Sequence, residues 1–147
     1  MEGPYKIVWQ IKVLSNLIKR EVGNYGCEKD FDELTGNNMF IIRHLAKYGD
    51  NDVFQKDLEE IFSVRRSTMS AIILRMEKKG FLIRESVPYD ARLKKIVLTE
   101  KGKHIHEMIE SRITDTEEKL AFGLSEEEKR TLCFLLEKLR RNLEPEN

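Results

Sequence analysis

The sequence predicts a mainly α (α+β) fold in which two helices and a β-hairpin form the centre. Through most of the chain, apolar residues recur at spacings of three and four, a pattern typical of amphipathic helices. The pattern becomes extended at Phe81–Glu85 and again at Lys95–Leu98, which predicts two antiparallel strands. A short helix, a brief turn and a second helix precede these strands within residues 52–99. This order is that of a winged helix-turn-helix, with further helices on both sides of it.

Length and composition restrict the class of protein. A chain of 147 residues has the size of one domain, and we expect a single domain over residues 1–147. With 40% hydrophobic and 35% charged residues, it is too apolar for a disordered chain and too charged for a membrane protein. Residues 1–6 lack the basic and apolar regions of an export signal. We therefore expect a soluble, cytoplasmic protein that does not bind membranes.

Helices are expected before and after the winged segment. The first ends at the turn residues Gly23–Gly26, and Thr35 is a plausible N-cap for the next. Thr99 caps a long helix, and Ser125 and Glu128 form a capping box before the last one. The first helix carries an apolar stripe of Ile7, Ile11, Leu14, Ile18 and Val22, and the last carries Leu132, Leu135, Leu136 and Leu139.

Local signals place the elements of the winged segment, residues 35–99. Asp52 and Gln55 resemble a capping box that opens its short helix, and Ser67–Lys79 forms the second helix. The second helix buries Met69, Ile72, Ile73 and Met76, and turns Arg66, Ser67, Ser70, Ala71 and Leu74 outward. Ser86–Lys94, between the strands, is too long for a tight turn, so we expect a long polar tip on the hairpin.

Charge is unevenly distributed although the formal net charge is zero. Residues 55–105 contain 12 Lys and Arg against 7 Asp and Glu, whereas residues 1–54 contain 7 against 8 and residues 106–147 contain 7 against 11. A basic middle between acidic ends is expected of a module that binds a polyanion, and a solvated charged face is the alternative. The hairpin after the basic helix favours nucleic acid.

A winged helix-turn-helix lays its second helix in the major groove of DNA, and its hairpin reaches the backbone or the minor groove. Small hydroxyl side chains let the helix approach closely, and arginines at its start can contact phosphate or a guanine edge. Lysines at the helix end and in the hairpin add attraction that does not depend on sequence. The candidate DNA-binding residues are Arg65, Arg66, Ser67, Thr68, Ser70, Lys78 and Lys94, supported by Lys79 and Lys95.

Two motifs resemble the MarR family of bacterial transcription regulators. Asp90-Ala91-Arg92, followed by Lys95–Gly102, is similar to the family's wing, where Asp-x-Arg precedes an apolar strand and Leu-Thr-x-x-Gly opens the next helix. Met76–Gly80 is similar to the end of the family's recognition helix. The resemblance implies that Arg92 enters the minor groove and that Asp90 holds it by a charge-assisted hydrogen bond. Both residues join the candidate DNA-binding set.

The resemblance also implies that Arg65–Lys79 is the recognition helix, and the chain departs from the family there. Many members have a small capping residue where Arg65 stands, an arginine where Ala71 stands and an acid where Leu74 stands. We therefore expect base contacts to concentrate at the start of the helix, and no operator sequence can be carried over from relatives.

The apolar stripes of the first and last helices predict a homodimer, because one chain has little left to cover them. Residues 4–26 and 100–144 would be dimerisation helices that hold two recognition helices roughly 34 Å apart. The expected protein is a repressor, or less often an activator, that binds a pseudo-palindromic operator in double-stranded DNA. The resemblance implies release by a small aromatic effector. Tyr5, Trp9, Phe40 and His44 would line its pocket, with core packing as their alternative role.

Other functions find less support in the sequence. His104 and His106 point to nearly opposite sides of a helix and cannot chelate one ion, and Cys27 and Cys133 form no CxxC pair. There is no glycine-rich phosphate loop and no nucleophile elbow, so we expect no enzyme, no metal and no cofactor. A winged helix that docks proteins is an alternative, as is a redox or metal sensor dependent on Cys27 or His44.

Overall fold

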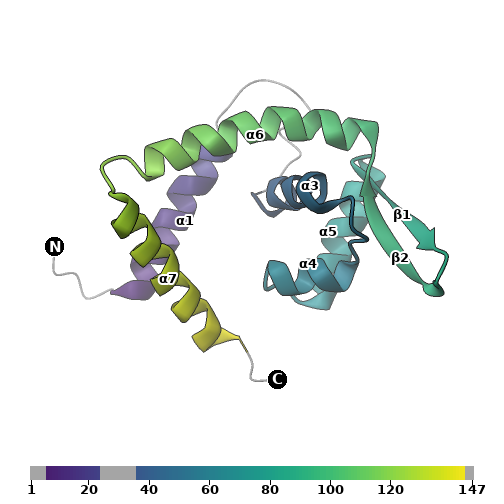
Figure 1. Ribbon diagram of the computed structural model, residues 1–147, viewed down its shortest axis with the longest axis horizontal. Coiled ribbons are helices and arrows are strands. Elements are labelled where there is room, and N and C mark those ends of the chain that lie inside the picture. The colour runs from purple at the N-terminus through teal and green to yellow at the C-terminus, as the bar shows by residue number, and fades with distance from the viewer. Residues whose placement is uncertain (1–5, 24–35, 145–147) are drawn as a thin grey trace. The chain divides into compact units, whose positions relative to one another are not determined.

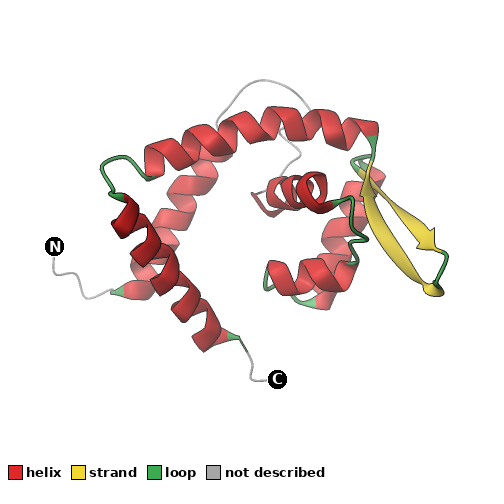
Figure 2. Cartoon of the chain, viewed as in Figure 1, coloured by secondary structure: helices red, strands yellow, loops and turns green. Residues whose placement is uncertain are grey.

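The structure, a computed structural model, describes residues 6–23 and 36–144. This part of the chain is mainly helical with a two-stranded antiparallel sheet, which confirms the predicted fold class (Figure 1, Figure 2). The chain forms two compact units, Met1–Thr116 and Glu117–Asn147. The elements in chain order are α1 (Ile7–Gly23), α3 (Gly36–Tyr48), α4 (Gln55–Ile61), α5 (Arg66–Lys78), β1 (Leu82–Val87), β2 (Asp90–Leu98), α6 (Glu100–Leu120) and α7 (Glu126–Leu143).

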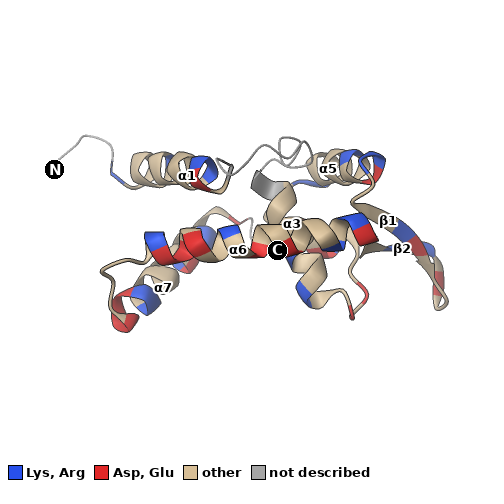
Figure 3. Cartoon of the chain, turned by 90° about the horizontal axis from the view of Figure 1, so that it is seen from above, with Lys and Arg blue, Asp and Glu red and all other residues tan. Residues whose placement is uncertain are grey.

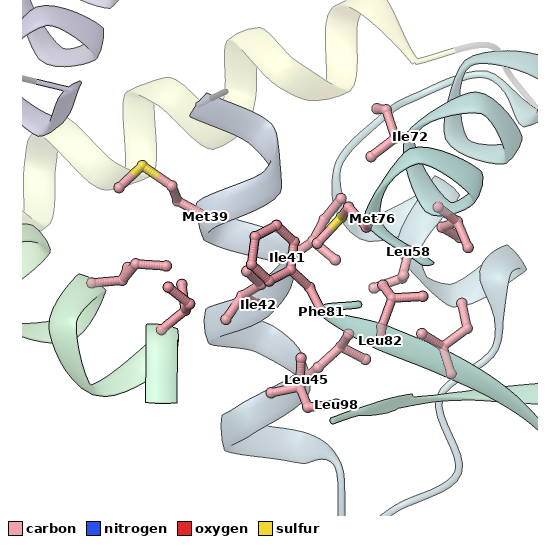
Figure 4. Close-up of a cluster of buried hydrophobic side chains, with 14 of the residues drawn as sticks. Met39, Ile41, Ile42, Leu45, Leu58, Ile72, Met76, Phe81, Leu82 and Leu98 are labelled. Carbon is pink, nitrogen blue, oxygen red and sulfur yellow. The ribbon is translucent and has the colours of Figure 1, made fainter. Parts of the chain in front are cut away.

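The core of the first unit lies between α3, α5, the base of the hairpin and the first turns of α6 (Figure 4). Ile41 and Ile42 of α3 and Phe81, which follows α5, are fully buried. The predicted inner face of α5 is confirmed, because Met69, Ile72, Ile73 and Met76 are all buried. Burying a side chain of this size contributes about 1.5–3 kcal/mol. The core therefore holds α5 with its opposite face turned outward.

The start of α4 differs from the prediction. The capping box expected from Asp52 and Gln55 is wrong, since α4 begins at Gln55 and its N-cap is Phe54. The preceding backbone is extended because it pairs with the hairpin, where the N–H of Ile96 donates to the carbonyl of Val53 at 2.7 Å. This pairing keeps Asp52 out of the helix and beside the hairpin.

The tip of the hairpin also differs from the prediction. The strands extend to Val87 and Asp90, so Pro88 and Tyr89 make the turn, and the long polar tip expected over Ser86–Lys94 is wrong. Residues 83–86 of β1 and 91–94 of β2 are exposed, and Val87 at the end of β1 is buried. A strand is recognised in a sequence by its alternation of apolar and polar residues. Where both faces of a strand are exposed this alternation is missing, so the sequence did not show how far the strands extend.

The hairpin meets α6 at Thr99 and Gly102. The N–H of Gly102 donates to Thr99 Oγ1 at 3.1 Å, so Thr99 caps α6 as predicted, and its hydroxyl donates to the Gly80 carbonyl. The N–H of Thr99 donates to the Phe81 carbonyl at 3.1 Å. That carbonyl stands so close to Gly102 that a Cβ there would lie well under 3.0 Å from its oxygen. The glycine of Leu-Thr-x-x-Gly is therefore required by a close approach of backbone to backbone.

Helices α1 and α3 and residues 100–116 of α6 complete the first unit. Val22 at the end of α1 is buried in the core, as are Ile105, Ile109 and Ile113 of α6. Arg43 of α3 binds Glu110 of α6 through two hydrogen bonds, Nε to Oε2 at 2.9 Å and Nη2 to Oε1 at 3.2 Å. Thr35, the predicted N-cap of α3, lies outside the described residues.

Helix α7 belongs to the second unit and opens with the predicted capping box. The N–H of Glu128 donates to Ser125 Oγ at 3.1 Å, and the N–H of Ser125 donates to the Glu128 carboxylate at 2.7 Å. The apolar stripe stays exposed, with Leu132, Leu135 and Leu136 at 44%, 49% and 46%. In the described ranges, no helix is long and apolar enough to cross a membrane.

Candidate nucleic-acid interface

The outward face of α5 carries the residues that were predicted to contact DNA. The helix begins at Arg66, and its N-cap Arg65 is extended, with φ −65° and ψ 150°. The exposed residues of this segment are Arg65, Arg66, Ser67, Thr68, Ser70, Ala71, Leu74, Arg75 and Lys78. They include every candidate named on this helix and no acidic side chain. The helix therefore presents a basic, hydroxyl-bearing surface to solvent.

Gln55, the first residue of α4, ties this surface to the preceding helix. Its Nε2 donates to Ser70 Oγ at 2.7 Å and to the Arg66 carbonyl at 3.4 Å. Because the Ser70 oxygen accepts this bond, Ser70 keeps its own hydroxyl hydrogen for another acceptor. Gln55 was not predicted from the sequence as part of the site.

A bulge in β2 presents Arg92. β2 contains nine residues and β1 contains six, and their register shifts between Ser86 and Val87. Ala91–Leu93 consequently have no partner in β1. Bulges bend a strand and re-aim its side chains. The Arg92 side chain is 91% exposed at this point of the hairpin.

Asp90 holds both the backbone and the side chain of Arg92. Its Oδ1 accepts from the Arg92 N–H at 2.9 Å and from Nε at 3.3 Å, while Oδ2 accepts from Nη2 at 3.3 Å. The guanidinium first, and the backbone N–H second, hold the pKa of the Asp90 carboxyl below its ordinary value. The contact implied by the Asp-x-Arg motif is thus present in the folded chain, and it orients an otherwise unsupported guanidinium.

The two lysines that follow have different contacts. Lys94 Nζ donates to Ser86 Oγ across the hairpin. Lys95 Nζ lies 3.4 Å from Asp52 Oδ1, and the hydroxyl of Tyr89 donates to Asp52 Oδ2 at 2.8 Å. This bond to Asp52 raises the pKa of Tyr89. Asp52 therefore joins the turn and the stem of the hairpin to the segment before α4, and Lys95 is partly neutralised.

One groove of about 720 Å³ brings the second helix and the hairpin together. Arg66 and Ser70 of α5 and Arg92 and Lys94 of β2 all line it, although they are far apart in sequence. Its basic residues are Lys56, Arg66, Arg84, Arg92 and Lys94, and its one acidic residue is Glu59. Figure 3 shows Lys and Arg in blue on α5 and along the hairpin. A groove with this charge attracts the phosphates of a nucleic acid.

Two of the basic lining residues, Lys56 and Arg84, were not predicted from the sequence. Arg84 Nη2 donates to the Glu77 carboxylate at 3.2 Å, which ties β1 to the end of α5. Both residues were included in the charge count of residues 55–105, but that count does not tell which side chains share one surface. In an exposed strand such as β1, the sequence pattern does not show which face meets a helix.

The predicted effector-pocket residues that the structure describes lie on two helices, with Trp9 on α1 and both Phe40 and His44 on α3. Trp9 is exposed on α1, Phe40 is exposed on α3, and Tyr5 is outside the described residues. His44 is half-buried, with ring centroids 4.7 Å from Tyr48 and 6.2 Å from Phe62. Burial lowers the pKa of His44, and the charge of Asp57 opposes this in part.

The described residues add no support to a metal sensor or a cysteine-based redox sensor. Over residues 6–23 and 36–144, no three His, Cys, Asp or Glu side chains gather in a cluster that could hold a metal ion. Cys133 is exposed on α7, and Cys27 lies outside the described ranges.

Known proteins match this chain both in the winged segment and over most of its length. A profile described as "MarR family" matches residues 33–93. The crystal structure of the transcription regulator MarR from Oenococcus oeni PSU-1 is 31% identical, with a TM-score of 0.80 over 90% of this chain and 97% of the other. The chain belongs to the MarR family. The crystal structure of an S. aureus MepR–DNA complex contains the same fold, with 20% identity, a TM-score of 0.85 and coverage of 97% and 100% of the two chains.

A second relative is also described as a transcriptional regulator. It is a Bacillus subtilis (strain 168) protein described as the uncharacterized HTH-type transcriptional regulator YybA, 29% identical over 116 residues, which are 79% of this chain and 75% of the relative. The MarR resemblance inferred from the wing and helix motifs is confirmed. The chain is therefore a transcription regulator of the MarR family with a winged-helix DNA-binding segment, and its family and fold are not those of enzymes.

Proposed function

We propose that this regulator is a homodimeric repressor that binds a pseudo-palindromic operator in the cytoplasm, with α5 in the major groove and the hairpin over the neighbouring minor groove. The observation that carries the proposal is the basic groove in which Arg66 and Ser70 stand beside Arg92 and Lys94. Phosphate contacts position a protein on the duplex, and base contacts specify the sequence. The groove offers cations for the first task, and the exposed α5 side chains serve the second.

Each candidate residue has a role that follows from its place. Arg65 and Arg66, at the helix start, reach phosphate or the O6 and N7 atoms of guanine. The hydroxyls of Ser67, Thr68 and Ser70 donate to phosphates or base edges, and Lys78 adds charge at the far end of the helix. Arg92, oriented by Asp90, enters the minor groove, where the negative potential is enhanced over A·T-rich steps. Lys94 binds the adjacent backbone.

Two exposed apolar stripes support the homodimer. On α1, Ile7, Ile11 and Leu14 are exposed, and on α7 the leucine stripe is about half exposed in the single chain. Large apolar patches are unusual on a monomer, and burying them against a second copy is the common solution. The two-fold axis of such a dimer matches the symmetry of a palindromic site. In this arrangement residues 4–26 and 100–144 are the dimerisation helices of one MarR-type domain.

An effector is the finer part of the proposal. Tyr5, Trp9, Phe40 and His44 supply aromatic surface for a small aromatic molecule between the dimer helices and the winged segment. Such a molecule would release DNA if it bound better to a dimer whose half-site spacing does not fit the duplex.

Fluorescence anisotropy with duplexes from the DNA upstream of the protein's own gene tests the proposal. We expect two chains to bind each operator. A plot of the logarithm of affinity against the logarithm of salt concentration should be a straight line, with a slope of about −0.9 for each phosphate that the protein neutralises. Arg92→Ala should weaken binding about 5- to 150-fold, the equivalent of about 1–3 kcal/mol. Lys103→Ala, an exposed change on α6 away from the groove, is the matched control.

Equal binding by the Arg92→Ala variant and the wild type would contradict the role given to the hairpin. An affinity that does not fall with salt would instead favour the alternative, in which the winged helix docks a protein through apolar contacts. One chain per operator would contradict the homodimer.

A further inference from the structure

An apolar side chain stands in the middle of the DNA-facing surface of α5. Leu74 lies seven residues, or two helical turns, after Ser67, and on the opposite side of the helix from the buried Met69 and Met76. Leu74 is 45% exposed. Isolated exposed leucines are common on protein surfaces, so exposure alone does not indicate a function for Leu74. The residues around it are the evidence for one.

The exposed residues that precede Leu74 on its face of α5 are small and uncharged. Ser67, Ser70 and Ala71 lie on the same exposed face, and each is shorter than leucine. The cations are at the two ends, with Arg65 and Arg66 before this face and Arg75 and Lys78 at its end. Leu74 is therefore the longest side chain of a short uncharged strip, which ends at Arg75 and Lys78.

That layout is complementary to a major groove, in which charged phosphate ridges border a floor of uncharged base edges. The floor presents hydrogen-bond donors and acceptors together with one kind of apolar group, the 5-methyl of thymine. A leucine cannot satisfy the donors and acceptors, and covering them would leave polar groups without water. Methyl groups are the part of the floor that gains from contact with a leucine.

We propose that Leu74, with Ala71 beside it, is a specificity-determining residue that recognises thymine methyl groups near the centre of each half-site. The proposal rests on the proposed function, in which α5 enters the major groove. It predicts that base reading extends to the middle of the helix and is not confined to the arginines and hydroxyls at its start.

Deoxyuridine supplies the test, because it differs from thymidine in lacking the 5-methyl group. High-affinity duplexes are first selected from a random-sequence pool with the full-length wild-type protein. Each thymine of the selected half-site is then replaced by uracil, one at a time, and affinities are measured for wild type, Leu74→Ala and Ile61→Ala. Ile61, at the end of α4, is an apolar residue of similar exposure, 43%, that does not line the basic groove, and it serves as the matched control.

We expect at least one thymine per half-site at which uracil weakens wild-type binding about fourfold, the effect of one buried methyl group. Leu74→Ala should bind the thymine and uracil duplexes equally, whereas Ile61→Ala should keep the wild-type difference. Urea unfolding checks that Leu74→Ala is folded, and we expect only a small loss of stability at an exposed site.

Two outcomes overturn the inference and are distinguishable from failure of the proposed function. If wild type selects a specific duplex but no thymine shows a uracil penalty, or if the penalty persists in Leu74→Ala, the thymine reading is wrong while DNA binding stands. If wild type selects no duplex at all, the proposed function itself is wrong, and this inference fails with it.

Discussion

Replacing Gly102 by alanine should destabilise the protein although alanine is the better helix former. Gly102 is in the first turn of α6, where its backbone passes the Phe81 carbonyl. A Cβ there would lie 3.2 Å from the Phe81 carbonyl carbon, 3.0 Å from Leu98 Cδ2 and closer still to the Phe81 oxygen. That oxygen also accepts the N–H of Thr99, so it cannot withdraw without weakening the junction between hairpin and helix.

The size of the effect follows from two opposing contributions. Forcing extra volume into a packed site costs about 1–3 kcal/mol, and contact with backbone belongs at the upper end of that range. The gain in helix propensity from glycine to alanine is at most about 1 kcal/mol. The net loss should therefore be about 2 kcal/mol. For a chain of this length that corresponds to a fall in Tm of about 6 °C.

Urea and thermal unfolding followed by circular dichroism measure this difference. Lys103→Ala puts an alanine one residue further along α6 at an exposed position, and its stability should stay within about 0.5 kcal/mol of wild type. The displaced hairpin of Gly102→Ala should also bind operator DNA more weakly. If Gly102→Ala is as stable as wild type or more stable, propensity outweighs the steric contact, and a steric requirement for glycine in the Leu-Thr-x-x-Gly motif is refuted.

Two further predictions concern Gln55 and His44. Gln55→Ala removes the bond to Ser70 Oγ, so DNA affinity should fall about fivefold, the equivalent of about 1 kcal/mol. Combined with Ser70→Ala, the two losses should be less than additive in a double-mutant cycle of operator affinities, and full additivity would show that Gln55 does not act through Ser70. His44 has a pKa below 6.5 because of burial, so the folded state binds fewer protons there than the unfolded state. Its share of the unfolding free energy is complete above about pH 6.5 and is lost as the pH falls through the lowered folded-state pKa. Urea unfolding at about pH 7.5 and about pH 5.5, on either side of the ordinary histidine pKa, should therefore show a smaller difference for His44→Gln than for wild type. Equal differences would rule out His44 as a source of the pH dependence.

The hairpin illustrates how a short sheet gains a fixed position. A two-stranded hairpin is marginal in isolation. In this protein Asp52 binds both Lys95 and Tyr89, and the Val53 carbonyl pairs with the strand at Ile96. These contacts come from the segment before α4, so the loop between α3 and α4 helps to set the direction in which Arg92 points.

Much of this protein could be inferred from the sequence alone, wherever one face of an element is buried. The inner face of α5, the caps at Thr99 and Ser125 and the order of helices and strands were all predicted, because burial imposes a period on apolar residues and caps depend on neighbours three residues away. The Asp90–Arg92 contact was implied by the resemblance of Asp-x-Arg to the family's wing, and the structure contains it.

Only the tertiary structure decided the features that depend on residues distant in sequence. Asp52 contacts the hairpin and does not cap α4 as expected. The exposed outer part of the hairpin has no alternation of apolar and polar residues from which its strands could be predicted. The bond from Gln55 to Ser70, the close approach of Gly102 to Phe81 and the basic groove exist because packing brings separate elements together. Local patterns encode which face of an element is buried, but not which partner it meets.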